Sequence, residues 1–74
     1  MRGTDVVKAI GRDAVEGLQE QAQAGRLRPA ELEITIGHWR DVQKGYAERE
    51  NPEAALAAGE VITQLMNLQR SRND

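Results

Sequence analysis

Apolar residues recur at helical spacing along three stretches of this 74-residue chain, and many of the positions between them are charged. A spacing of three or four residues places side chains on one face of an α-helix. The pattern therefore predicts an all-α single domain whose last two helices form a hairpin. The predicted helices are Asp5–Ala24, Ala30–Glu50 and Pro52–Arg70, and the ends at 1–3 and 71–74 are expected to be disordered.

The sharpest predicted boundary lies at Asn51 and Pro52, between the second and third helices. Asparagine is favoured as an N-cap, and proline suits the first helical position because its missing N–H needs no partner there. The same proline disfavours helical backbone in the residues just before it. We therefore expect a tight turn between the two arms of the hairpin.

The first predicted helix combines an apolar stripe with two internal glycines. The stripe consists of Val7, Ile10, Ala14, Leu18 and Ala22. Gly11 lies on this stripe and Gly17 at its edge, although a glycine inside a helix costs about 1 kcal/mol relative to alanine. We interpret both glycines as points of close helix crossing, in preference to a hinge. Gly25 is expected to end the helix.

Residues 30–37 fit two secondary structures. Helical spacing gives a common face to Leu32, Ile36, Trp39, Gln43 and Tyr46. Apolar and polar residues also alternate from residue 31 to 36, which is typical of a half-buried strand. A lone strand would lack a partner within the chain, so we favour the helix. The alternative is a strand at 31–36 in a dimeric ribbon-helix-helix-like arrangement. In the helix, Ile34 points away from the stripe and is a candidate surface contact.

The third predicted helix has a broad apolar arc. Its members are Ala54, Ala55, Ala58, Val61, Ile62, Leu65, Met66 and Leu68. Such breadth allows contact with two neighbours, either two helices or one helix and a partner chain. Leu56 falls outside the arc.

Composition raises the question of how so short a chain stays folded. It has no cysteine for a disulfide, a single histidine, and no phenylalanine. We therefore expect a homodimer, or a larger protein partner that completes the core. No apolar run is long enough to span a bilayer, and the basic-then-apolar order of a secretory signal is missing, so a cytoplasmic location is expected.

Charge and chemistry narrow the function. The net charge is −2 with both signs mixed along the chain, which disfavours nucleic-acid binding. A small DNA-binding regulator is the alternative, but the ribbon would present Glu31 and Glu33 to DNA, which is the wrong sign. His38 and Asp41 share a helical face, and we interpret them as an exposed local hydrogen bond rather than half of a catalytic or metal site.

The hypothesis that remains is a non-enzymatic protein-interaction module, such as an adaptor, cochaperone or regulatory subunit, acting through apolar helix faces. No catalytic residue, cofactor, metal or small-molecule ligand is indicated, and no motif selects a family. The aromatic residues and the broad arc supply the interface candidates. These candidates are Ile34, Trp39, Tyr46, Leu65 and Met66.

Overall fold

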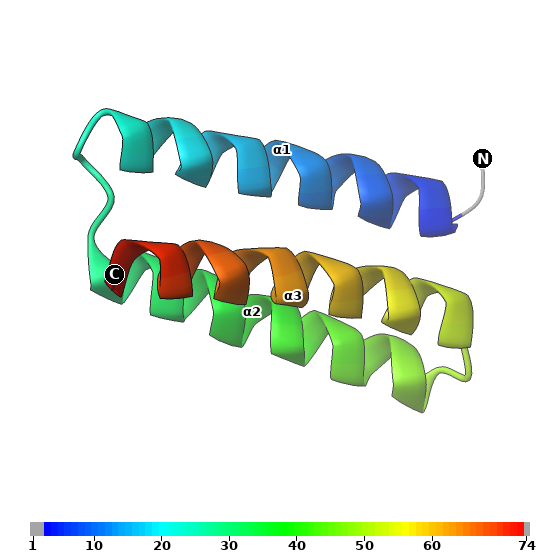
Figure 1. The fold of residues 1–74 in the computed structure, drawn as a ribbon. Helices are drawn as coiled ribbons and strands as arrows, with labels where there is room; N and C mark the ends of the chain where they lie inside the picture. Colours follow the sequence, from blue (N-terminus) through cyan, green and yellow to red (C-terminus); the bar gives the residue numbers. More distant parts are fainter. Residues whose placement is uncertain (1–2, 74) are drawn as a thin grey trace.

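The computed structural model describes residues 3–73, which form three consecutive antiparallel helices (Figure 1). They are α1 (Gly3–Gln23), α2 (Pro29–Glu48) and α3 (Pro52–Asn73). The predicted all-α fold with a C-terminal hairpin is confirmed. The strand alternative is wrong, because residues 31–36 lie in the first turns of α2 and the described chain contains no strand to pair with them.

The helices reach closer to the chain ends than the sequence predicts. Helix α1 already begins at Gly3, and α3 continues through residues 71–73, all of which were expected to be disordered. Helical hydrogen bonds are local, so a helix can continue beyond its last packed side chain. The rest of that expectation concerns residues 1, 2 and 74, which lie outside the described residues. Within residues 3–73, every helix is too short or too polar to cross a membrane.

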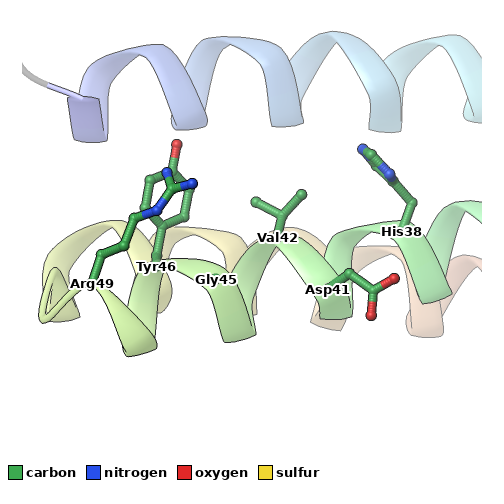
Figure 2. A pocket seen from close by; sticks show the side chains of 6 residues that line it. All are labelled: His38, Asp41, Val42, Gly45, Tyr46 and Arg49. Atoms are coloured by element: carbon green, nitrogen blue, oxygen red, sulfur yellow. The ribbon is translucent and has the colours of Figure 1, made fainter.

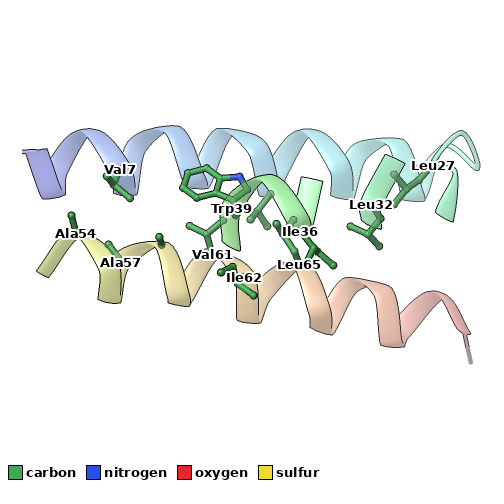
Figure 3. Close-up of a cluster of buried hydrophobic side chains, with 12 residues drawn as sticks. Val7, Leu27, Leu32, Ile36, Trp39, Ala54, Ala57, Val61, Ile62 and Leu65 are labelled. Carbon is green, nitrogen blue, oxygen red and sulfur yellow. The ribbon is translucent and has the colours of Figure 1, made fainter. Parts of the chain in front are cut away.

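Helix α3 holds the molecule together, because it packs against both α1 and α2 while those two make few contacts with each other. The buried side chains form one cluster between the helices (Figure 3). Its members are Val7, Val15, Leu27, Leu32, Ile36, Trp39, Ala54, Ala57, Ala58, Val61, Ile62 and Leu65. The broad arc of α3 is thus covered on its two flanks by helices of the same chain.

The packed face of α1 follows the predicted stripe except at Ile10: Val7 is buried, and Ala14, Leu18 and Ala22 pack partly buried against the core. Val7 and Val15 are buried, whereas Ile10, expected on the stripe, is 55% exposed. The reason is that α1 faces α3 through Gly11, and residues four positions before and after a helical residue share its face. Val7 and Val15 are these two residues, so Ile10 turns outward.

Gly11 marks the close approach of α1 and α3. A Cβ atom built at Gly11 would overlap Cγ2 of Val61 on α3, so only glycine fits without a shift. The predicted close crossing is therefore confirmed at Gly11. It is wrong at Gly17, where an added Cβ would have nothing within 4 Å.

Asn51 joins α2 to α3 by hydrogen bonds in both directions. Its N–H donates to the carbonyl oxygen of Tyr46 (2.9 Å), and its Oδ1 accepts from the N–H of Ala54 (3.3 Å), which confirms the predicted N-cap. The N–H of Glu50 donates to the carbonyl oxygen of Ala47 (3.1 Å), which completes a Schellman motif at the end of α2. Glu50 holds the left-handed position of that motif, with φ of 60°.

The end of α1 has the same motif with a glycine in the left-handed position. Gly25 has φ of 71°, and its N–H donates to the carbonyl oxygen of Ala22 (3.1 Å). The N–H of Arg26 donates to the carbonyl oxygen of Gln21 (2.8 Å). A side chain in this conformation costs roughly 1–2 kcal/mol, a cost that Glu50 bears and Gly25 avoids.

Alanine substitution tests the close crossing at Gly11. Gly11→Ala should lower the free energy of unfolding by about 1–3 kcal/mol, because the methyl group overpacks against Val61. Gly17→Ala is the matched control and should raise the free energy of unfolding by about 0.5–1 kcal/mol through helix propensity. Urea unfolding followed by circular dichroism measures both. Similar shifts for the two variants would contradict the crossing.

Glycine substitution tests the strained end of α2. Glu50→Gly should raise the free energy of unfolding by about 1 kcal/mol, because it removes the side chain from a left-handed conformation. Arg49→Gly is the control: its φ is −86°, so glycine relieves nothing there and should lower stability by up to about 1 kcal/mol. Thermal melts of both variants make the comparison. A destabilised Glu50→Gly variant would rule out the motif.

Candidate protein-interaction surface

The predicted interface residues differ in exposure. Trp39 and Leu65 are buried in the core of the single chain, where α3 and α2 pack together, and their contact with a partner stays a prediction. Tyr46 is partly buried against the same core. Ile34 is 72% exposed and Met66 40% exposed, so these two side chains remain on the surface.

The broad apolar arc of α3 has its explanation within one chain. We expected it to touch two neighbours, and it does so, since α1 and α2 both pack on it. Most of the arc is therefore covered without a second copy, and Met66 is the large arc residue that stays exposed. Any partner surface has to be found outside the core cluster.

One open hollow of about 340 Å³ lies along α2 (Figure 2). All of its lining residues belong to α2, and they are His38, Asp41, Val42, Gly45, Tyr46 and Arg49. The side chains of His38, Val42 and Tyr46 point toward the same side of the helix in Figure 2.

The polar side chains that line this hollow are not arranged as a hydrogen-bonded pair or as a metal site. His38 and Asp41 both line it and both are exposed, but no hydrogen bond joins them, so the predicted local hydrogen bond is not formed. Within the described residues, no three His, Cys, Asp or Glu side chains come together as a metal site. A catalytic nucleophile would also need a base and an orienting group within reach.

A more apolar depression lies along the hairpin, between α2 and α3. It consists of two adjoining hollows of about 650 Å³ and 400 Å³, which share Gln43 and Leu56. The remaining lining residues are Ala47, Glu50, Pro52, Ala55, Gly59, Glu60, Ile62 and Thr63. We name this surface the hairpin groove. No residue of α1 lines the groove itself, although Leu56 and Glu60 also line a neighbouring hollow with Thr4 and Lys8 of α1.

Gln43 bridges the two helices at the hairpin groove. Its Nε2 donates a hydrogen bond to the carbonyl oxygen of Ala55 (3.3 Å). Gly59 leaves room for this amide, because a Cβ atom there would lie 2.8 Å from Nε2 of Gln43. The sequence places Gln43 on the apolar face of its helix, and the structure shows it partly buried there. Small residues and one bridging amide therefore leave the groove shallow enough for another backbone to approach.

Leu56 is the prominent apolar side chain of the hairpin groove, and sequence reasoning did not select it. It is 68% exposed and contributes to both hollows. The sequence did contain a sign of its exposure, because Leu56 lies outside the apolar arc of its helix. A large apolar side chain in such a position cannot pack into the core. Ile34 carries the same signal on α2 but does not line the groove.

The chain matches no protein-family model, no curated protein and no solved structure. Its surfaces are therefore interpreted through their own shape and chemistry.

Proposed function

We propose that this chain is a non-enzymatic protein-interaction module, an adaptor, cochaperone or regulatory subunit, that binds a larger protein through the hairpin groove. The observation that carries the proposal is an apolar groove between α2 and α3 with Leu56 exposed in it, on a domain that fills its core with its own side chains. Exposed apolar depressions are typical of binding surfaces. The expected cytoplasmic location stays part of the proposal.

The binding mode follows from the shape of the groove. An amphipathic helix of the partner would lay its apolar face between α2 and α3. Ala55 and Gly59 allow close backbone approach, and Leu56 contributes a large apolar contact. Removing a leucine side chain from water stabilises an interface by about 1.5–3 kcal/mol, so Leu56 supplies a substantial part of the affinity.

A larger partner is favoured over a second copy. The sequence argument for a homodimer combined the small number of large apolar side chains in so short a chain with the wide apolar arc of α3. Helices α1 and α2 of the same chain cover most of that arc, which weakens its second half. The exposed Leu56 and Met66 still offer a surface to a second copy, so self-association is measured beside partner binding.

Photocrosslinking tests the proposal. A photoreactive phenylalanine analogue at Leu56 should give a discrete covalent adduct in cells of the native host, because the partner covers this position. The same analogue at Glu33, an exposed position outside the groove, is the control and should give none. Mass spectrometry identifies the adduct, and excess unlabelled wild-type chain should suppress it. Failure to form any adduct at Leu56, with the variant folded, would contradict the module.

A DNA-binding regulator is the alternative function, and the structure removes the paired strands that motivated it, since residues 31–36 are helical. Heparin chromatography separates the two functions. The chain should elute from heparin near 0.1 M salt or below, because its net charge is −2 and its acidic and basic residues are mixed. Strong retention with a steep salt dependence would favour nucleic-acid binding.

A further inference from the structure

We propose that the occupant of the hairpin groove is an amphipathic helix whose apolar stripe is flanked by lysine or arginine. This inference rests on the proposed function and adds the chemical class of the partner. It is carried by the charge of the groove, by the backbone conformation of Glu50 and by the dimensions of the apolar floor.

The charged lining residues of the hairpin groove are all acidic. Glu50 lines one hollow and Glu60 the other, and no lysine or arginine lines either. Arg40 and Lys44 belong to α2 but do not contribute to the lining. A partner that brings basic side chains to these carboxylates is steered and oriented by them, whereas an acidic partner is repelled.

Leu56 lies within the acidic part of α3. Glu53 precedes it by three residues and Glu60 follows it by four, so all three share one helical face. Glu53, Leu56 and Glu60 also line one common hollow beside the groove, in which Lys8 of α1 supplies the single basic side chain. Glu60 lines a further hollow with Lys8 and Arg12, so its basic neighbours lie on its α1 side and none of them lines the groove. On the groove side the exposed Leu56 is bordered by carboxylates, which matches an apolar position bordered by basic residues on the partner.

The backbone conformation of Glu50 is a second, independent reason to expect basic side chains on the partner. Its φ of 60° places a glutamate where glycine would be more stable, while the same position at the end of α1 is Gly25. Side chains held in such conformations are found preferentially where they contribute to binding or catalysis. A carboxylate at the end of the groove that binds a basic side chain of the partner accounts for a glutamate in this position.

The dimensions favour a short helix. On α3 the lining extends from Pro52 to Thr63, which corresponds to roughly 16 Å at the helical rise of about 1.5 Å per residue. An apolar stripe of about three turns fills this length. The Gln43 amide and the small residues Ala55 and Gly59 leave room for a slender element such as a helix, but less room for the surface of a globular domain.

A phage-displayed library of 16-residue peptides with a fixed apolar stripe and random polar positions is the probe, with the intact chain as target. Enriched clones should carry lysine or arginine beside the stripe. As synthetic peptides they should bind the Glu50→Lys/Glu60→Lys variant at least about tenfold more weakly than wild type, and Leu56→Lys should weaken them similarly. Added salt should weaken binding to wild type.

The control variant is Glu16→Lys/Glu20→Lys, which makes the same change in net charge at exposed positions of α1. Its peptide affinity should stay within about twofold of wild type. Glu50→Gly separates binding from folding: its melting temperature should rise by about 4 °C or more, whereas its peptide affinity should fall several-fold. Circular dichroism confirms that each variant is folded before it is used.

The inference is overturned if enriched clones lack basic residues, if they bind the doubly charge-reversed variant as tightly as wild type, or if no clone distinguishes wild type from Leu56→Lys. If a partner crosslinks at Leu56 but any of these results is obtained, the proposed interaction module is supported. Only the proposal that its partner is a helix with basic flanks is then contradicted. Self-association that disappears in Leu56→Lys would assign the groove to a second copy and also overturn the inference.

Discussion

The packing of α3 against both other helices is the constraint on which the rest of the structure depends. Because α1 and α2 make few contacts with each other, each is held in place mainly through α3. Small residues permit this double contact: Ala57 and Ala58 are buried on α3, and Gly11 lets α1 approach Val61. The same arrangement buries most of the broad apolar arc of α3, so the domain has a core of its own.

The hairpin groove is a consequence of how α2 and α3 are joined. Asn51 accepts and donates hydrogen bonds at the end of α2 and the start of α3, which leaves a very short connection between two helices that pack together (Figure 1). Gln43 and Gly59 meet where a larger pair of side chains would fill the space. The result is a surface with a shallow apolar floor, an exposed Leu56 and carboxylates at Glu50 and Glu60.

Local chemistry is what could be predicted from the sequence. Helical spacing and the cap at Asn51 depend on residues near one another in the chain, and the structure confirms them. The close crossing at Gly11 is confirmed too, but its partner Val61 is far away in the chain and was not predicted. The exact centre of the packed face of α1 depends on which neighbour Gly11 meets, so periodicity placed Ile10 inward by mistake. From the sequence alone, Trp39 could lie in the core or in an interface. Its burial in the single chain depends on where α3 packs, which local patterns do not predict. The groove arises from residues of two helices and therefore has no sequence pattern of its own.

The central claim is that α3 organises a complete single-chain core and thereby leaves the hairpin groove free for a partner. Thermal unfolding at about 5 µM and about 500 µM chain tests it most directly, because the stability of an obligate dimer depends on concentration. Trp39 is the sole tryptophan and is buried between the helices, so its fluorescence reports on the core while circular dichroism reports on the helices. The account predicts one transition with the same midpoint for both probes and both concentrations. A midpoint that rises with concentration, or separate transitions for the two probes, would contradict it.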